Sequence, residues 1–283
     1  MKKILITGAN SYIGTSFEKW VSQYPDKYYV DTIDMEDNHW KEKPFKGYDV
    51  VFHVAGIAHI KETRKNTNLY YKVNRDLAYE LAQKAKNDGV MQFIFLSSMS
   101  VYGIENGTID KNTPLNPKSN YGKSKLQAEE LIITLEEDAF KVAILRPPII
   151  YGKGCKGNYP RLSNFAQKAP FFPNVKNKRS MIHIDNLCEF VRLLIDGYSR
   201  GLFFPQNEEY VCTSEMVKLI AEVHGKKVKM IKLFNPLLRV LKLSTVNKVF
   251  GNLVYEKKMS EYKENYYPQD FITSIGTTEG QNK

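Results

Sequence analysis

The stretch SNYGKSK, residues 119–125, holds a tyrosine and a lysine four positions apart. In a helix, positions i and i+4 lie on one face, so the phenol of Tyr121 and the ammonium of Lys125 would stand side by side. A phenol next to a cation is suited to exchanging a proton with a carbonyl oxygen. The chain contains 18 tyrosines and is rich in lysine, so about one or two such spacings should arise by chance. The spacing alone therefore does not identify a catalytic pair, and the elements around it must be considered.

A glycine-containing turn, TGANSYIG at residues 7–14, lies between a strand pattern and a helical pattern. Gly8 would permit a tight turn, Gly14 would allow close packing of helix on strand, and the helix amino terminus would face a pyrophosphate. Ser11 stands where such turns usually have a middle glycine, and its hydroxyl would either cap the helix or bond a phosphate oxygen. The turn predicts dinucleotide binding by Gly8, Asn10, Ser11, Tyr12, Ile13 and Gly14.

Asp34 lies 26 residues after Gly8, at the end of the predicted second strand. A carboxylate at this place accepts hydrogen bonds from both ribose hydroxyls and repels a 2′-phosphate. The three residues after it, Met-Glu-Asp, offer no cation for that phosphate. We therefore expect NAD(H) to be preferred, with NADP(H) as the alternative. A solvated acidic loop is the other interpretation of this segment.

The apolar run QFIFLSS ends at Ser98, 23 residues before Tyr121. Ligands gather at the carboxyl ends of strands in open α/β sheets, where Ser98 would hydrogen-bond a substrate oxygen. Lys125 and a positively charged nicotinamide would lower the pKa of the Tyr121 phenol. A Tyr-x-x-x-Lys at a helix start, after a serine-ended strand and behind a glycine turn, favours a catalytic pair over a chance spacing.

The elements that must position these residues alternate between strand and helix over the first 150 residues. Strand patterns are expected at 2–8, 27–34, 48–56, 92–98 and 140–152, and helical patterns at 12–24, 68–88 and 119–137. Such alternation is typical of a doubly wound parallel sheet, an α/β fold of the Rossmann type.

Beyond residue 152 the pattern changes to short strands and helices. The predicted elements are a loop at 152–160, a helix at 161–169, a strand running into a helix capped by Asp185 or Asn186 at 179–195, a strand at 227–233, a helix near 235–250 and a frayed polar end at 274–283. We therefore predict a dinucleotide-binding lobe at 1–155, to which 180–200 returns, and a smaller, mainly substrate-binding lobe at 156–283.

Composition argues against several classes of protein. No run approaches eighteen apolar residues and the start MKKILITGAN lacks the apolar core of a signal peptide, so no membrane segment and a cytoplasmic location are expected. The three cysteines include no Cys-x-x-Cys pair, and the five histidines lack the spacing of a metal helix. We expect no metal, and His53 and His183, inside strand patterns, are interpreted as packed core residues. The formal charge of +10 favours an anionic partner without selecting one.

The chain resembles the extended short-chain dehydrogenases/reductases that act on nucleotide sugars, the NAD-dependent epimerase/dehydratase family. The resemblance covers nearly all of the chain. It is carried by TGANSYIG, Asp34, VFHVAG at 51–56, Asn74, FLSSMSVYG at 95–103, YGKSK at 121–125, LRPPIIYG at 145–152 and RSMIHIDNL at 179–187.

The resemblance implies roles for individual residues. Ser98, Tyr121 and Lys125 would be catalytic, and Arg179 would hold the substrate diphosphate. Asn158 and Arg161 would be further substrate contacts, for which a solvated loop is the alternative interpretation. The implied cofactor contacts beyond the glycine turn and Asp34 are Val54, Ala55, Gly56, Asn74, Tyr121, Lys125 and Pro148, and the implied substrate contacts include Ser98 and Ser100. A homodimer would form through the helix containing Asn74 and the helix beginning at Tyr121.

Three reactions compete within this family. The 4,6-dehydratases carry Asp-Glu after the active-site hydroxyl, since elimination of water needs an acid and a base, whereas this chain has Met99 and Ser100. A 4-ketoreductase, with Tyr121 as proton donor, and a 4-epimerase with tightly bound NAD would use the same residues. The segments 120–125, 140–187 and 248–260 look most like bacterial enzymes of capsule and surface-glycan synthesis that reduce UDP-4-keto-6-deoxy-N-acetylhexosamines. We therefore expect a UDP-sugar 4-ketoreductase, with the 4-epimerase as the alternative.

A dinucleotide-binding regulator without chemistry is the alternative of another class. The basic and aromatic stretch YEKKMSEYKENYYPQ, residues 255–269, would then dock on an anionic surface or a nucleic acid. Such proteins usually lack the tyrosine or the lysine of the pair, and both are present here. The expected partner is a UDP-sugar, with no nucleic acid.

Overall fold

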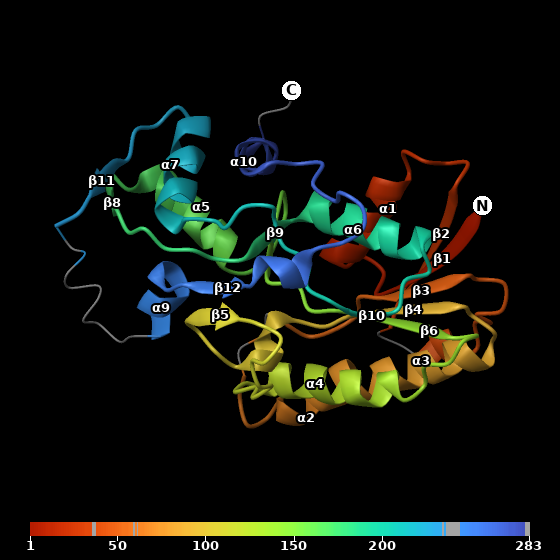
Figure 1. The fold of residues 1–283 in the computed structure, drawn as a ribbon. Helices are drawn as coiled ribbons and strands as arrows, with labels where there is room; N and C mark the ends of the chain where they lie inside the picture. The colour runs from red at the N-terminus through yellow and green to blue at the C-terminus, as the bar shows by residue number, and fades with distance from the viewer. Residues whose placement is uncertain (36–37, 59, 61, 234, 236–243, 281–283) are drawn as a thin grey trace. The chain divides into compact units, whose positions relative to one another are not determined.

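Six parallel strands form the central sheet among the residues that the computed structural model describes, which are 1–35, 38–58, 60, 62–233, 235 and 244–280 (Figure 1). The strand order is β10-β6-β4-β3-β1-β2. Their bounds are Lys2–Thr7 (β1), Tyr28–Ile33 (β2), Val50–His53 (β3), Gln92–Leu96 (β4), Lys141–Leu145 (β6) and Gly201–Phe203 (β10). The chain leaves β1 toward β2 and returns on its other side as β3, so the strand order reverses next to β1. The predicted doubly wound α/β fold is confirmed, and this reversal is where such sheets bind ligands.

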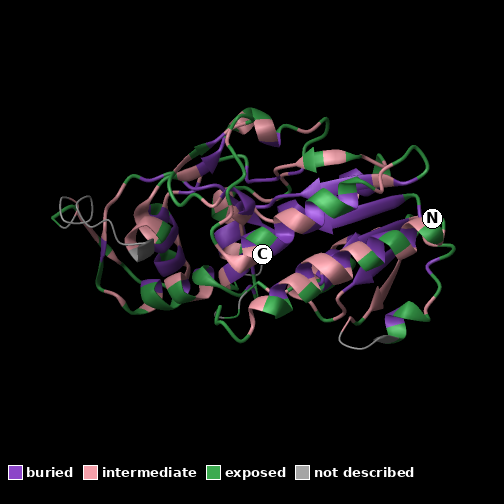
Figure 2. Ribbon diagram, turned by 90° about the horizontal axis from the view of Figure 1, so that it is seen from below, coloured by how far each residue is buried: buried purple, intermediate pink, exposed green. Residues whose placement is uncertain are grey.

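The helices of this part of the chain pack on the sheet through apolar faces. They are α1 (Tyr12–Val21), α2 (Thr67–Tyr71), a π-helical turn η2 (Lys72–Asp76), α3 (Leu77–Asn87), α4 (Asn120–Ile133) and α6 (Ile184–Asp196), with 3₁₀ turns η1 (Asn38–Lys41) and η3 (Met99–Tyr102). β3 and β4, in the middle of the sheet, are wholly buried, whereas β2 at its edge is mostly half-buried, and Figure 2 shows the helices as mixed. One core cluster joins alternate strand residues to α3 and α4, including Leu5, Phe93, Leu81 and Ile132. Burial of these faces is the main source of stability for such layers.

Two compact units divide the chain. The first unit comprises Met1–Gly103, Pro114–Pro147 and Leu187–Pro205, and the second comprises Ile104–Thr113, Pro148–Asn186 and Gln206–Lys283. The first unit therefore leaves off at Pro147, where the sequence led us to expect 155, and takes up again at Leu187–Pro205, where a return at 180–200 was expected; 104–113 belongs to the second unit. The reason for the last difference is that β5 (Gly107–Ile109) pairs with β12 (Leu253–Tyr255), far along the chain.

The second unit is built from pairs of short parallel strands and several helices. β7 (Ile149–Tyr151) pairs with β9 (Met181–His183), and β8 (Phe171–Pro173) pairs with β11 (Lys229–Ile231). Its remaining elements are α5 (Asn158–Lys168), α7 (Thr213–Val223), α9 (Ser244–Phe250), η4 (Lys257–Ser260) and α10 (Phe271–Glu279). α7 contacts both α5 and α10.

Four local predictions were wrong. The helix at 68–88 is interrupted by η2, and the strand at 140–152 is two strands, because Pro147 and Pro148 separate β6 from β7. α6 begins at Ile184, so Asp185 and Asn186 lie in its first turn and not at its cap. The end of the chain is helical as far as Glu279, whose carboxylate accepts hydrogen bonds from Tyr159 (2.7 Å) and Ser163 (2.8 Å) on α5.

Of the helix predicted near 235–250, residues 236–243 lie outside the described residues, as do 281–283 of the tail.

His53 and His183 are buried core residues, as predicted. No helix in the described ranges has the length and apolar character that a bilayer crossing requires. The three cysteines are free thiols. His59 lies outside the described residues.

Candidate active site

The glycine turn after β1 meets the segment after β3 at the carboxyl edge of the sheet. Gly8 has φ +99°, and a Cβ on it would lie 3.0 Å from the backbone nitrogen and Cα of Ala55. The backbone N–H of Ala55 in turn donates to the carbonyl oxygen of Thr7 at 3.0 Å. Only glycine combines the left-handed backbone with so close an approach. The two segments are therefore joined at the point where the strand order reverses.

Ser11 caps α1. Its Oγ accepts a hydrogen bond from the backbone N–H of Gly14 at 3.1 Å. A Cβ on Gly14 would lie 2.7 Å from that Oγ and 3.1 Å from a methyl group of Ile6 on β1. Of the two roles open to the serine, the structure shows the cap, and Gly14 permits both the cap and the close helix-to-strand packing.

Asp34 follows β2 directly and is exposed beside the glycine turn. The carbonyl oxygen of the preceding residue, Ile33, accepts hydrogen bonds from the N–H groups of Gly8 (2.9 Å) and Ala9 (3.1 Å). A carboxylate, a glycine turn and the amino terminus of α1 are thus held within one short stretch of surface. This donor and acceptor set fits a dinucleotide, with its pyrophosphate at the helix terminus and a ribose at Asp34.

Tyr121 and Lys125 lie one turn apart at the start of α4, as predicted from their spacing. The Nζ of Lys125 donates to the carbonyl oxygen of Leu96 at 2.8 Å and lies 4.7 Å from the centre of the Phe95 ring. Only 4% of Lys125 is exposed. Burial lowers the pKa of the Lys125 ammonium to about 8, and the charge of Glu129 opposes that shift.

Ser98 lies close enough to Tyr121 for its hydroxyl to favour the ionised phenol. The Oγ of Ser98 accepts from the hydroxyl of Ser100 (2.8 Å) and from its backbone N–H (3.2 Å), so its own proton is available for another acceptor. Burial raises the pKa of Tyr121 and the hydroxyl of Ser98 lowers it. The sequence-based expectation of a lowered phenol pKa is not met by the chain alone, because desolvation is the larger cause.

Asn74 occupies the π-helical turn η2 and is fully buried. Its side chain donates to the carbonyl oxygen of Ile57 (3.0 Å) and to Ser124 of α4 (3.2 Å), and accepts from the N–H of Ile57 (2.8 Å). A Cβ on Gly56 would lie 3.0 Å from the Oδ1 of Asn74 and 3.2 Å from the Nζ of Lys125. Asn74 therefore ties the segment after β3 to α4, next to Lys125. Turns of this kind are frequent at functional sites.

The predicted contact residues in the second unit differ in how far they are buried. Asn158 and Arg161 are exposed on the first turns of α5, and Pro148 is buried before β7. Arg179 is buried, and its Nη1 donates to the carbonyl oxygens of Asn247 (3.3 Å) and Gly251 (3.2 Å). Within the described residues its Nε is buried without a hydrogen-bond partner.

The acceptor residues of Arg179 line a pocket of about 560 Å³ in the second unit. Its lining combines asparagine and lysine side chains with apolar ones, and a pocket of this size suits a small organic ligand. The lining residues are Asn106, Asn174, Val175, Lys176, Lys232, Asn235, Val246, Asn247, Phe250, Gly251 and Asn252. Asn158 and Arg161 are not among them.

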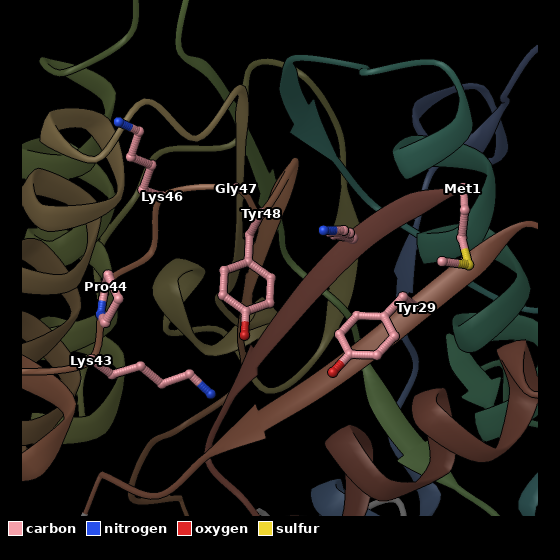
Figure 3. A pocket seen from close by; sticks show the side chains of 8 residues that line it. Met1, Tyr29, Lys43, Pro44, Lys46, Gly47 and Tyr48 are labelled. Carbon is pink, nitrogen blue, oxygen red and sulfur yellow. The ribbon is translucent and has the colours of Figure 1, made fainter.

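Another pocket, of about 550 Å³, lies in the first unit at the amino ends of β1 and β2 (Figure 3). Its lining includes Lys3, Tyr29, Lys43 and Tyr48. Both Lys43 (2.8 Å) and the phenol of Tyr48 (2.5 Å) donate to the carboxylate of Asp31, which offsets the lysine charge. The pocket is at the opposite ends of the strands from the glycine turn, and none of the predicted site residues lines it.

Sequence reasoning missed a buried polar group around α4. Glu129 and Arg146 form an ion pair with a 2.5 Å contact between Oε2 and Nη2. Glu129 is four residues after Lys125 on the same helix face, and Arg146 ends a buried strand. Charged residues at such apolar positions are the pattern that could have revealed them.

Sequence spacing also does not indicate a contact at the start of α4. There the carboxylate of Glu62 accepts a hydrogen bond from the backbone N–H of Tyr121 at 3.1 Å.

Comparison with known proteins agrees with this geometry. Residues 4–204 match the model of the NAD dependent epimerase/dehydratase family. A UDP-glucose 4-epimerase from Vibrio cholerae is 32% identical over 78% of this chain and 75% of its own length. An N-acetyl-alpha-D-glucosaminyl-diphospho-ditrans,octacis-undecaprenol 4-epimerase from Escherichia coli O157:H7 is 29% identical over 83% of this chain and 76% of its own.

The fold has solved counterparts. A dTDP-4-dehydrorhamnose reductase from Clostridium acetobutylicum superposes with a TM-score of 0.74 over 98% of both chains, at 21% identity. At that identity the likeness concerns the fold alone. The family match, by contrast, spans more than half of the chain and includes the glycine turn, Ser98, Tyr121 and Lys125. The chain therefore belongs to the NAD dependent epimerase/dehydratase family, whose cofactor is NAD(H).

Proposed function

We propose that the protein inverts C4 of a UDP-hexose or UDP-N-acetylhexosamine, as a 4-epimerase. The observation that carries the proposal is the placement of Tyr121 and the buried ammonium of Lys125 one turn apart on α4, with Ser98 close to the phenol. These groups suit proton transfer at a sugar oxygen. Met99 and Ser100 stand where elimination of water would need an acid and a base, which argues against a dehydratase.

The relatives support this choice of reaction. The two curated relatives compared above are both 4-epimerases, and one of them exceeds 30% identity over most of the chain. Their substrates are sugars joined to a diphosphate. A diphosphate-linked hexose is therefore the substrate class that we propose for this chain.

The first unit offers the groups that would hold the cofactor. The amino terminus of α1, opened by Gly8 and capped by Ser11, would bind the pyrophosphate, and Asp34 would accept hydrogen bonds from a ribose. The carboxylate of Asp34 favours NAD over NADP because it repels a 2′-phosphate. When bound, NAD supplies the acceptor and then the donor of the hydride at C4.

The side chains of the site move and hold the proton. Tyr121 would take the proton of the C4 hydroxyl as the C4–H bond is oxidised, and would return it to the oxygen when the other face is reduced. Ser98 would donate a hydrogen bond to the same sugar oxygen, with its orientation set by the two bonds from Ser100. The ammonium of Lys125 would favour the ionised phenol by its positive charge.

The second unit is proposed as the substrate lobe. Arg179 has a buried Nε without a partner among the described residues, and its Nη1 contacts residues that line the pocket described above. Lys176 and Lys232 add positive charge to the lining. These features support binding of a nucleoside diphosphate. Asn158 and Arg161 remain proposed substrate contacts on the exposed side of α5.

A 4-ketoreductase is the second candidate. It is favoured by the resemblance of residues 140–187 and 248–260 to enzymes that reduce UDP-4-keto-6-deoxy-N-acetylhexosamines. The site would then act once, with Tyr121 giving its proton to the forming alkoxide. Capsule or surface polysaccharide precursors would be the products.

One pair of assays separates the two reactions. The purified protein is incubated with UDP-N-acetylglucosamine or UDP-glucose and NAD, and the products are resolved by NMR. A mixture of C4 epimers with no net change in absorbance at 340 nm supports the epimerase. The second assay supplies UDP-4-keto-6-deoxy-N-acetylglucosamine with NADH or NADPH. Stoichiometric loss of absorbance there, with no epimerisation in the first assay, would replace the proposed epimerase by the reductase.

A further inference from the structure

Glu129 and Arg146 form an ion pair inside the first unit, where only 4% and 5% of the two residues are exposed. The guanidinium holds the carboxylate through three contacts, with Nε 3.1 Å from both oxygens and Nη2 2.5 Å from Oε2. Its Nη1 donates to the phenol of Tyr102 on η3 at 3.0 Å. The hydroxyl of Ser97 donates to Oε1 of the same carboxylate. Both charges are therefore fully matched by hydrogen bonds.

The pair is joined to the predicted catalytic residues through the end of β4. The carbonyl oxygen of Leu96 accepts a hydrogen bond from Lys125, the hydroxyl of Ser97 donates one to Glu129, and Ser98 lies close to the phenol of Tyr121. Three consecutive residues at the end of one strand thus meet three side chains of α4. The register of α4 against this strand end decides whether these contacts form together.

Arg146 connects the same helix to the segment that carries Ser98 and Ser100. It follows β6, and the residue after it, Pro147, accepts a hydrogen bond from the N–H of Met99 at 3.0 Å. Its contact with Tyr102 reaches the other end of η3. One guanidinium therefore fixes α4 and η3 to the end of β6.

A buried ion pair is weak support for a purely stabilising role. Replacing such a pair by well-packed apolar residues is often neutral or stabilising, whereas removing one partner leaves an unmatched buried charge. What the pair provides here is a fixed carboxylate one helical turn from Lys125. The ammonium otherwise lies against the Phe95 ring and a single carbonyl oxygen.

Several titratable groups act around Lys125. Tyr121 and Glu129 lie on its own helix, His53 on β3, Tyr102 on η3, and Arg146 at the end of β6. Burial and the charge of Lys125 lower the pKa of His53 to about 3, so its ring is neutral in the working range. The carboxylate of Glu129 is the charge that favours the ammonium form of Lys125.

We propose that Glu129 and Arg146 are positioning residues of the active site, which seat α4 on residues 96–98 and keep the buried Lys125 ammonium charged. This inference rests on the proposed function in so far as Lys125 serves catalysis. The side-chain contacts described above join Glu129 and Arg146 to each other, to Ser97 and to Tyr102. Their loss should therefore change the pH dependence of turnover more than the affinity for substrate.

The first test is Glu129→Gln, which keeps the shape of the side chain and removes its charge. The variant lacks the carboxylate charge that favours the Lys125 ammonium, and it leaves the buried guanidinium of Arg146 unmatched. We expect the alkaline limb of the kcat profile to move down by about one pH unit or more. At pH 8 kcat should fall about fivefold or more, because the charged fraction of a group with a pKa of about 8 falls from about one half to about one eleventh when the pKa drops by one unit, while KM changes less than about twofold. Glu129→Asp, which keeps the charge, should restore the position of the limb.

Glu130→Gln is the matched control, because Glu130 is the next residue of α4 and is exposed. It should leave both the limb and kcat unchanged. If Glu129→Gln does not fold, Glu129→Gln/Arg146→Met removes both charges and leaves none unmatched. Its alkaline limb should still lie below that of the wild type. A folded variant with a wild-type limb and wild-type kcat would overturn the positioning role.

A readout without turnover keeps this test apart from the proposed function. The Lys125 ammonium is titrated by NMR in protein with labelled lysine, with its resonance assigned by its loss in Lys125→Met. A lower titration midpoint in Glu129→Gln than in the wild type supports the inference even if the wild type proves inactive in both sugar assays. An equal midpoint overturns it whatever the enzyme's reaction.

Discussion

The Nζ of Lys125 donates a hydrogen bond to the carbonyl oxygen of Leu96 at 2.8 Å. This bond anchors the helix that carries Tyr121 to the end of β4, two residues before Ser98, so Lys125 fixes the positions of Tyr121 and Ser98 relative to each other. The helix spacing brings Tyr121 and Lys125 together, and the strand end adds the serine. Conservative substitutions at Tyr121 and Lys125 should therefore change the rate of the reaction without unfolding the protein.

Tyr121→Phe should abolish most of the activity without unfolding the protein. It removes the proton carrier, and the loss in kcat should be about 10²- to 10⁴-fold. Lys125→Met should also lower kcat about 10²-fold, since it removes the charge that favours the ionised phenol. Initial rates on the substrate identified above measure both effects. Tyr29→Phe, at an exposed tyrosine of β2, should keep full activity; comparable activity in Tyr121→Phe would remove this residue from the chemistry.

Asp34→Asn should weaken the preference for NAD over NADP. The substitution removes the charge that repels a 2′-phosphate and weakens the hydrogen bonds to the ribose, so the ratio of the two dissociation constants should shift about tenfold toward NADP. Cofactor binding followed by fluorescence titration gives that ratio without any sugar substrate. Asp26→Asn, on an exposed turn before β2, serves as the control. An unchanged ratio would contradict the role given to Asp34.

Gly8→Ala should cost both stability and cofactor binding. The new Cβ would meet the backbone of Ala55 at 3.0 Å on a residue with φ +99°, so the loss should be about 2 kcal/mol or more. Gly89→Ala is a matched control, because Gly89 also has a left-handed backbone (φ +81°) but has nothing within 4 Å of the added atom. It should cost about 1 kcal/mol and leave NAD binding intact. Urea unfolding and NAD titration of both variants would show whether the close approach, and not the backbone angle, makes the difference.

Stability should fall as the pH is lowered below about 6.5. Burial lowers the pKa of His53 to about 3 and that of His183 to about 4, against 6.5 for a histidine in water. Between these values the unfolded chain binds protons that the folded chain does not, so folding becomes less favourable as the pH falls. Each histidine adds a slope of up to about 1.4 kcal/mol per pH unit.

Urea unfolding at several pH values between about 7 and 5 measures this slope. His53→Gln should make the slope shallower, since one of the two buried histidines no longer titrates. His39→Gln changes an exposed histidine and should leave the slope as it is. An identical slope in wild type and His53→Gln would mean that other groups govern acid unfolding.

A homodimer through α2–α3 and α4 is a further prediction. Leu69 on α2 and Leu131 and Ile133 on α4 are exposed apolar residues, with exposed fractions of 43%, 36% and 43%. Two copies would bury them against each other, as expected for this family from the sequence. Light scattering should give twice the chain mass of 32.7 kDa, and Leu131→Glu/Ile133→Glu should return the protein to monomers. A mass of one chain for the wild type at micromolar concentration would exclude the dimer.

Local patterns were sufficient for most of the elements of the first 150 residues, although not for the π-helical turn η2, the break between β6 and β7, or β5. A strand, a glycine turn and an amphipathic helix are each specified by neighbours within a few positions, so β1, α1 and α4 are found where the sequence predicts them. The spacing of Tyr121 and Lys125 needs only a helix to become a shared face. The family, its fold and its NAD cofactor follow from these local features.

Contacts between residues far apart in the sequence determine two features that the local pattern does not predict. Pairing of β5 with β12 joins residues more than 140 positions apart and assigns 104–113 to the second unit. The tail at 274–279 is polar in sequence and helical in the structure, because Ser274 and Glu279 find buried hydrogen-bond partners at Tyr151 and Tyr159. The hydrophobic periodicity of the sequence does not predict such long-range pairings.

The same division holds at the site. The residue types at the strand ends and helix starts, and so the chemistry that they can perform, can be read from the sequence. The folded structure was needed to show that Leu96 and Ser97 bind different residues of α4, that Ser98 lies close to Tyr121, and that Arg146 neutralises Glu129 one helical turn from Lys125. The physical reason is that burial and charge compensation depend on what surrounds a group in space, whereas spacing along the chain fixes only its nearest turn or strand.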